Sequence, residues 1–308
     1  MSGGRTKVVL HPANLVGVPE ALARVGGIDL VCATSDDEIA DELRTDAVFI
    51  SYTWKAAYLQ PGLRWVQSHS AGVAQFPIES FRERKIVLTS ASGVHVVCAE
   101  HAIGLLLALS RGLDAAIKDM PAHHWGARVS AEIAGRTVVV LGLGAIGQQI
   151  VDRLSGWDVR IIGVTRSPGE HAGVVPDVRP LGELAAACAE ASVLMIALPD
   201  APETRQLVSA EVLDALGQGY VINIARGAVV DQSALIDRLR DGRLAGAGLD
   251  VTVPEPLPND SPLWDLPNVI ITPHVAGLTP RYGERLASLL ADNLRAFHGQ
   301  GEWRNRIS

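Results

Sequence analysis

The 308-residue sequence is poor in cysteine and carries no excess of positive charge. Its three cysteines, Cys32, Cys98 and Cys188, lie far apart and form neither a CxxC pair nor a cluster with histidines, a pattern that favours reduced, buried thiols. Lys and Arg number 27 against 34 Asp and Glu, and no basic run occurs. Nucleic acid and anionic membrane surfaces are therefore not expected as partners, and a small metabolite suits the chain better.

Long apolar runs and metal-ligand patterns are also missing. The longest apolar stretch, residues 102–109, is too short to span a bilayer. The N-terminal residues lack the apolar core of a secretory signal, so we expect a cytoplasmic protein. The histidines show no HExxH or similar spacing, so we expect no metal.

Short apolar runs that alternate with longer mixed segments indicate an α/β protein with two doubly wound, parallel-sheet domains. A run that is apolar on both faces is typical of a strand buried in a parallel sheet, and the segments between the runs are long enough for helices. The strand-like runs of the first set are residues 7–10, 30–33, 47–51, 65–68 and 86–89. Those of the second set are residues 137–141, 159–164, 193–198, 220–224, 246–251 and 269–272. The second set, with its helical crossovers, is typical of the dinucleotide-binding version of this fold.

Two further segments have helical patterns. Residues 97–118 contain no proline and are apolar on nearly every face, which predicts one long buried helix. Residues 281–297 are amphipathic and follow the second set of strands, so we expect them to pack against the first domain. The first domain is then discontinuous, with residues 1–97 and 281–308 in one domain and residues 98–280 in the dinucleotide-binding domain.

A GxGxxG sequence directly follows a predicted strand and opens a predicted helix. In this setting Gly142 makes the tight turn, Gly144 lets the backbone approach a pyrophosphate, and Gly147 allows the helix to sit close to the strand. The phosphates then meet the helix N-terminus at Ala145 and Ile146, where free N–H groups and the helix dipole favour an anion. A lone GxGxxG also serves ordinary turns, but the strand before it and the helix after it favour a nucleotide site.

The next strand ends without an acidic residue. Enzymes that use NAD commonly place Asp or Glu there to hold the adenosine ribose, whereas this strand ends in Thr165, Arg166 and Ser167. A guanidinium between two hydroxyls suits the additional phosphate of NADP, so NADP is the expected cofactor and NAD the alternative. Arg166 as an ordinary solvated residue is the competing interpretation.

Three later segments, together with the glycine fingerprint, resemble the D-isomer-specific 2-hydroxyacid dehydrogenases. They are VINIARG at residues 221–227, GLDVTVPEP at residues 248–256 and ITPHVAG at residues 271–277. The resemblance covers nearly the whole chain, and the end of the second strand looks like that of the NADP-using glyoxylate and hydroxypyruvate reductases. It implies a flavodoxin-like substrate domain, a Rossmann dinucleotide-binding domain, and hydride transfer between NADP(H) and a small 2-oxo acid or 2-hydroxy acid.

The resemblance places the catalytic residues at Arg226, Glu255 and His274, and their chemistry suits the reaction. A guanidinium can grip and polarise a 2-oxo acid through paired donors, and imidazole titrates near neutrality, so His274 can protonate the ketone oxygen. A carboxylate on the other ring nitrogen would fix the tautomer and favour the imidazolium, which is the role expected of Glu255. Taken singly, each residue could have an ordinary structural partner, but together at strand ends they favour a site.

The resemblance also assigns a substrate site in the first domain. The loop positions whose N–H groups would hold the substrate carboxylate are Ala71, Gly72 and Val73. The family often has Asp at position 74, where this chain has Ala74. This difference leaves the geometry of the loop open. Tyr52 and Trp54 follow the third predicted strand, where they could wall the pocket, and core packing explains them almost equally well.

Further cofactor contacts implied by the resemblance are Pro199, Thr204, Ala225 and Asp250. Asp250 matches the residue that contacts the nicotinamide carboxamide, and a turn or capping role is its alternative. In relatives, the region before residue 137 helps to form a homodimer, so we expect one here.

Other functions stay open. The same fold serves dinucleotide-sensing corepressors, and related dehydrogenases act on formate or phosphite. A phosphoglycerate dehydrogenase is less expected, because no regulatory domain follows the last predicted helix.

Overall fold

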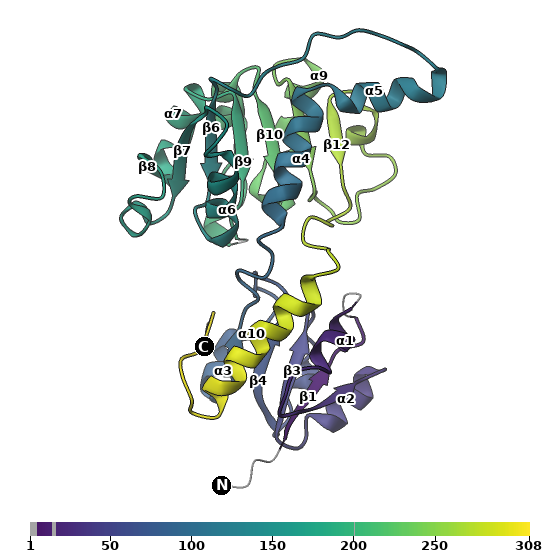
Figure 1. Ribbon diagram of the computed structural model, residues 1–308, viewed down its shortest axis with the longest axis vertical. Coiled ribbons are helices and arrows are strands. Elements are labelled where there is room, and N and C mark those ends of the chain that lie inside the picture. The colour runs from purple at the N-terminus through teal and green to yellow at the C-terminus, as the bar shows by residue number, and fades with distance from the viewer. Residues whose placement is uncertain (1–4, 14–16, 200) are drawn as a thin grey trace. The chain divides into compact units, whose positions relative to one another are not determined.

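The computed structural model describes residues 5–13, 17–199 and 201–308. The chain divides into two compact units: unit 1 comprises Met1–His95 and Leu278–Ser308, and unit 2 comprises Val96–Gly277. Each unit is built on one sheet, and all pairs of neighbouring strands described in these sheets run parallel (Figure 1). The predicted fold class, two α/β units with doubly wound parallel sheets, is thereby confirmed.

Unit 1 has five strands in the order β2-β1-β3-β4-β5, the order of flavodoxin-like folds. They are β1 (Thr6–Leu10), β2 (Ile28–Cys32), β3 (Ala47–Ser51), β4 (Leu63–Ser68) and β5 (Val87–Thr89). The helices are α1 (Val18–Leu22), α2 (Asp36–Glu42), the 3₁₀ turn η1 (Ala56–Tyr58), α3 (Ile78–Glu83) and α10 (Tyr282–Phe297). Because successive strand residues point to opposite faces, Val8 and Val9 enter two different apolar layers, one on each side of the sheet.

Helix α10 brings the end of the chain onto the sheet of unit 1. Its residues Leu286, Leu290 and Leu294 recur at a helical spacing and pack in the same apolar layer as Val8 and Trp65. Unit 1 is therefore assembled from two separated stretches of the chain.

Unit 2 has seven strands in the order β12-β11-β10-β9-β6-β7-β8. They are β6 (Thr137–Leu141), β7 (Arg160–Thr165), β8 (Asp177–Pro180), β9 (Val193–Ile196), β10 (Tyr220–Asn223), β11 (Gly246–Leu249) and β12 (Val269–Ile271). Its α-helices are α4 (Cys98–Ser110), α5 (Leu113–Asp119), α6 (Ala145–Leu154), α7 (Leu184–Ala189), α8 (Ala210–Leu216) and α9 (Gln232–Arg240). Short 3₁₀ turns are η2 (Met120–Ala122), η3 (Pro168–His171), η4 (Leu181–Glu183), η5 (Pro202–Thr204), η6 (Gly227–Val229) and η7 (Pro262–Asp265). The strand order reverses between β6 and β9, the point of such a sheet where ligands bind.

Two details of unit 2 differ from the sequence prediction. Strand β8 was not predicted, because this edge strand is only partly buried and carries charged residues: Arg179 bonds Asp177 on its own strand and Glu190 after α7. The predicted single helix over residues 97–118 is wrong as well. It breaks after Ser110, and Gly112, with φ of 66°, precedes α5.

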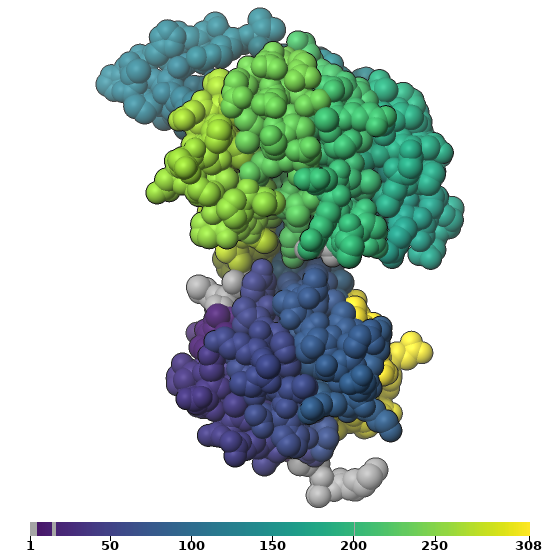
Figure 2. All heavy atoms as spheres, turned by 180° about the vertical axis from the view of Figure 1, so that it is seen from behind, coloured from purple at the N-terminus to yellow at the C-terminus, as the bar shows by residue number. Residues whose placement is uncertain are grey.

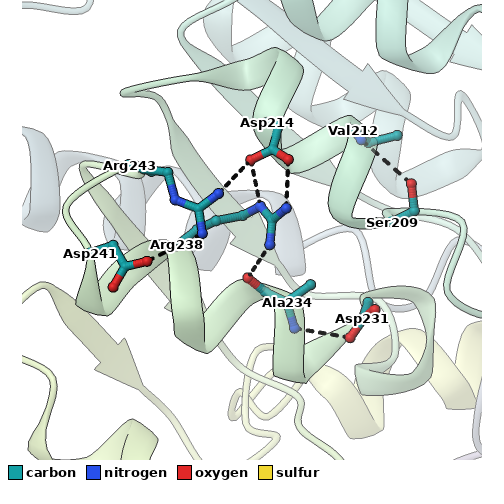
Figure 3. Close-up of polar contacts among 8 residues, drawn as sticks. All are labelled: Ser209, Val212, Asp214, Asp231, Ala234, Arg238, Asp241 and Arg243. Carbon is teal, nitrogen blue, oxygen red and sulfur yellow. Dashed lines mark hydrogen bonds and ion pairs between the residues drawn. The ribbon is translucent and has the colours of Figure 1, made fainter.

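An ion-pair cluster joins α8 to α9, the helix that follows the loop after β10 (Figure 3). Asp214 accepts two hydrogen bonds from Arg238, at 2.8 and 2.6 Å, and a third from Arg243 at 2.9 Å. Arg238 is only 8% exposed and also donates to the Ala234 carbonyl. Because paired donors meet a carboxylate in fixed geometry, the cluster anchors α9 behind that loop.

Helix α5 and the segment after it stand away from the body of unit 2 (Figures 1 and 2). The large apolar side chains exposed along this arm are Leu113, Ile117, Met120, Trp125 and Val129. Among the described residues, no helix combines the length and the apolar character needed to cross a membrane.

Candidate active site

The glycine fingerprint forms the turn between β6 and α6. Gly142 has φ of 98°, and a Cβ there would lie 2.6 Å from the Ala197 carbonyl oxygen. A Cβ on Gly147 would lie 1.8 Å from the Gly142 carbonyl oxygen, so α6 can approach the turn only without a side chain at this position. Gly144 differs, since a Cβ there would meet nothing within 4 Å.

The N-terminus of α6 is open to a ligand. Gly144 is its N-cap and offers no side-chain hydrogen bond to the first turn, and Ala145 is exposed. The first N–H groups of a helix have no partner within the helix and carry partial positive charge. The open space at Gly144 and these N–H groups together fit a pyrophosphate.

The end of β7 presents a cation with an acidic neighbour. The Thr165 side chain is buried, whereas the Arg166 side chain is 76% exposed. Its Nη1 lies 3.1 Å from Oε1 of Glu203, which lies in η5. Sequence reasoning missed Glu203, because this contact joins residues that are 37 positions apart.

The loop after β9 closes on itself through Thr204. Its hydroxyl lies 3.0 Å from the Pro199 carbonyl and 2.9 Å from the Ala201 carbonyl, and it accepts from the Ala201 N–H. Thr204 is 5% exposed, while Pro199 is exposed. The hydroxyl of Thr204 therefore holds the loop, and Pro199 lies on its surface.

Arg226 follows β10 in a loop shaped by Asn223. The Asn223 side chain accepts from the Ala225 N–H and donates to the Arg226 carbonyl, each at 3.0 Å. Ala225 itself is buried. A Cβ on Gly227 would lie 2.2 Å from the Thr252 carbonyl oxygen, so this loop packs directly against the backbone that leads to Glu255.

The Arg226 guanidinium keeps most of its donors free. Within the part of the chain that the structure describes, its hydrogen bond is from Nη1 to the Ala225 carbonyl at 2.7 Å, and no carboxylate pairs with it. Because a guanidinium has five N–H donors, the remaining ones can take an anion.

His274 and Glu255 form the closest pair of predicted catalytic residues. Nδ1 of His274 lies 2.8 Å from Oε2 of Glu255, and the Oε1 atom of Glu255 accepts from the Thr252 N–H at 3.1 Å. A carboxylate can only accept a hydrogen bond, so Nδ1 carries the proton of this bond. Nε2 is the ring nitrogen that is left to act on a substrate. Both side chains are about one-third exposed, at 37% and 36%.

Asp250 lies beneath the His274 loop. It is 2% exposed, and its carboxylate accepts from the Thr272 hydroxyl at 2.6 Å and from the N–H groups of Val275 and Ala276 at 2.9 and 3.0 Å. Both oxygens are thus used within the loop. These hydrogen bonds fix the backbone around His274, as the capping alternative expects, and Oδ2, for which the described residues supply one donor, can accept another.

The predicted substrate residues of unit 1 lie in different settings. Among the described residues, no acceptor takes the N–H groups of Ala71, Gly72 or Val73, so this loop can offer them to an anion. Tyr52 is 47% exposed. Trp54 instead packs against other rings, edge-on to Tyr58 and Phe81 and tilted to Phe49 and Phe76.

No metal centre is found in the described ranges, where no three His, Cys, Asp or Glu side chains gather as ligands would.

Comparison with known proteins decides the family. Residues 103–276 match the model of the NAD-binding domain of the D-isomer specific 2-hydroxyacid dehydrogenases. Glyoxylate reductase from Pyrococcus furiosus is 34% identical over 250 residues, which cover 77% of this chain and 73% of that enzyme. The chain belongs to the D-isomer specific 2-hydroxyacid dehydrogenase family. The resemblance inferred from the motifs is confirmed.

Two further relatives bear on function. NADPH-dependent glyoxylate/hydroxypyruvate reductase from Sinorhizobium meliloti, solved with NADP and malonate, superposes with a TM-score of 0.82 at 30% identity, over 99% of this chain and 97% of that one. D-3-phosphoglycerate dehydrogenase from Mycobacterium tuberculosis is 34% identical over 242 residues, which cover 76% of this chain and 45% of that enzyme. The chain thus spans about half the length of this second relative.

Proposed function

We propose that the protein reduces a small 2-oxo acid to the D-2-hydroxy acid, with NADPH as the preferred hydride donor. Glyoxylate and hydroxypyruvate are the first candidate substrates, because relatives of this chain are named as reductases of these acids. The observation that carries the proposal is the 2.8 Å hydrogen bond between His274 and Glu255, which lie in unit 2 together with the glycine fingerprint. This pair supplies a proton donor in a family with an NAD-binding domain.

The residues present fit an NADP cofactor. The N–H groups at Ala145 and Ile146 would hold the pyrophosphate, and Arg166, flanked by Thr165 and Ser167, would hold the 2′-phosphate. Bound there, the cofactor supplies a hydride. NAD stays the alternative because Glu203 places a carboxylate 3.1 Å from Arg166.

The chain's own residues supply binding and a proton. Arg226 would grip the substrate carboxylate and polarise the ketone oxygen, since its free donors form a planar fork. His274 would pass the proton on Nε2 to the ketone oxygen as a hydride reaches C2, which leaves one hydroxyl and one new C–H bond. Glu255 holds the donor's orientation through Nδ1 and stabilises the imidazolium.

The free N–H groups of Ala71, Gly72 and Val73 support a further role, which is to bind the substrate carboxylate. Backbone N–H groups in a turn form a concave site for anions. Tyr52, which is half-exposed, is the better candidate for a substrate contact than Trp54, which is partly buried and packs against other aromatic side chains.

The test is a screen of NADPH oxidation with glyoxylate, hydroxypyruvate, pyruvate and larger 2-oxo acids. Formate and phosphite are tested in the opposite direction, by following the reduction of NADP. Turnover of a 2-oxo acid supports the proposal. Tight NADPH binding without turnover of any of these compounds would favour the dinucleotide-sensing alternative.

We also propose that the protein is a homodimer, and that the arm formed by α5 and the segment after it makes the contact between the two subunits. Trp125 and Val129 are fully exposed and Met120 is 70% exposed, and such apolar patches mark interaction sites. A dimer in light scattering that becomes a monomer in Trp125→Asp supports this, and a monomeric wild-type protein would contradict it.

A further inference from the structure

We propose that His101 is a positioning residue for the proton donor His274 and acts through Thr272 and Asp250. The proposal rests on the proposed function, in which His274 protonates the substrate. It adds a side chain on α4 that no sequence motif assigned to the site.

Two glycines of β11 bring His101 to the site. A Cβ on Gly248 would lie 2.8 Å from the Cβ of Leu105, and a Cβ on Gly246 would lie 3.3 Å from the side chain of Leu109. Helix α4 therefore lies directly on β11. One turn before Leu105, His101 reaches the carboxyl end of that strand, where Asp250 follows.

The hydrogen bonds between these residues have a defined direction. The Thr272 hydroxyl is 2.6 Å from Oδ1 of Asp250 and 2.8 Å from Nε2 of His101. Because the carboxylate can only accept, the single Thr272 proton is directed to Asp250. Nε2 of His101 must then donate to the Thr272 oxygen, which fixes a proton on that nitrogen. A relay of side chains runs from His101 through Thr272 to Asp250. Oδ1 of Asp250 also lies 3.6 Å from Nε2 of His101, which is beyond hydrogen-bond distance, so the hydrogen-bonded route passes through Thr272.

Asp250 in turn holds the backbone of the loop. Its carboxylate accepts the N–H groups of Val275 and Ala276, and its carbonyl accepts the N–H of His274 at 2.8 Å. Three successive N–H groups are thereby fixed to one residue. The imidazole of His274 is fixed separately, by Glu255.

The loop needs this support because His274 has φ of 55°. A side chain with a Cβ seldom adopts this left-handed conformation, which persists only where surrounding contacts enforce it. Without the contacts, the backbone would relax and turn the imidazole away from its bonded position. The contact from His101 orients the Thr272 hydroxyl and so keeps one of these supports in place.

The experiment compares turnover in matched variants. His101→Leu should lower kcat by roughly five- to tenfold, the factor of one ordinary hydrogen bond, and leave the KM for NADPH unchanged. His101→Gln, whose amide can still donate, should restore most of the turnover. Glu100→Gln, on the same helix but exposed, is the control and should stay within about twofold of wild type.

A second pair tests the relay itself. Thr272→Val removes the hydroxyl at constant shape and should lower kcat at least as much as His101→Leu, while Thr272→Ser should retain turnover. The double variant His101→Leu/Thr272→Val should be no slower than Thr272→Val alone, because both changes break one relay. Wild-type kcat in His101→Leu, or two effects that multiply, would overturn the proposal.

Amide hydrogen exchange provides a readout that needs no substrate. The peptide with Val275 and Ala276 should exchange faster in His101→Leu and Thr272→Val than in wild type or His101→Gln. Unchanged exchange would overturn the relay even if turnover fell. If the wild-type enzyme reduced no 2-oxo acid, the proposed function would fail, and exchange would still decide whether His101 holds the loop.

Discussion

Arg166 and Glu203 allow a quantitative prediction about cofactor choice. We expect Arg166→Ala to lose activity with NADPH and to keep it with NADH, because only NADPH has a 2′-phosphate. The Arg166 side chain is 76% exposed, so its attraction to the phosphate is close to the value in water. Two unit charges 4 Å apart attract each other by about 1 kcal/mol in water. A phosphate with nearly two charges then contributes about 2 kcal/mol, or roughly 30-fold in kcat/KM.

Glu203 should act in the opposite direction. Its ion pair with Arg166 is exposed on both sides, at 76% and 50% of the side-chain area, and such pairs contribute about 0 to 1 kcal/mol. NADPH has to compete with this pair. Glu203→Gln should therefore raise kcat/KM for NADPH by up to about fivefold and leave that for NADH unchanged.

The assay is initial rates with each cofactor at saturating 2-oxo acid. Arg160→Ala is the matched control, since this arginine lies at the other end of β7 and pairs with Asp177 and Glu190. It should leave the ratio of the two cofactors unchanged. If Arg166→Ala lowered both activities equally, or neither, the reasoning about the 2′-phosphate would be refuted.

His274, Gly227 and His69 each offer a further test. His274→Gln should lose most of kcat at unchanged NADPH affinity, measured by fluorescence titration, because the proton donor is lost and the fold of the nucleotide site is not. Gly227→Ala should also lower kcat strongly, because its Cβ would lie 2.2 Å from the Thr252 carbonyl oxygen and push apart the loops of Arg226 and Glu255. Burial lowers the pKa of His69 to about 4, so the unfolded state takes up its proton first. The contribution of this group to the free energy of unfolding is therefore complete above about pH 6.5. As the pH falls from about 6.5 to about 4, the free energy of unfolding decreases by roughly 1.4 kcal/mol per pH unit. Urea unfolding at pH 7 and pH 5 should show this loss in wild type and a smaller one in His69→Met.

The outcomes that contradict these predictions are distinct. Near-normal turnover of His274→Gln would show that the proton comes from another group. Normal kinetics in Gly227→Ala would mean that the two loops can separate without cost. An equal loss of stability in wild type and His69→Met would assign the acid sensitivity to other residues.

Much of the fold could be predicted because its strands are apolar on both faces. Residues such as Val8 and Val9 fill opposite layers, so a short continuous apolar run marks each buried strand. Strand β8 lacked this signal, because it lies at the sheet edge and its charges are satisfied by ion pairs. The break at Gly112 was missed, because an apolar helix pattern on both sides of a glycine does not reveal its left-handed conformation.

The candidate site could be predicted largely where its residues follow strands, and Glu255, which lies farther from the end of β11, was placed by the family resemblance. Arg226 and His274 follow β10 and β12, whose carboxyl ends share one edge of the sheet. Contacts made by residues far apart in the chain carry no such local signal. Glu203 and His101 were missed for this reason. Asn223 was also missed, but it lies at a strand end before a turn, which is a sequence context typical of a side chain that stabilises a turn.

The most direct test of the central claim follows the hydride and the proton to one product. With NADPH deuterated at the transferred position and hydroxypyruvate or glyoxylate as substrate, the wild-type enzyme should form a 2-hydroxy acid with deuterium bound to C2, of D configuration where C2 is a stereocentre. His274→Gln should form it far more slowly. A product without deuterium, an L product, or equal rates in the two enzymes would contradict the account.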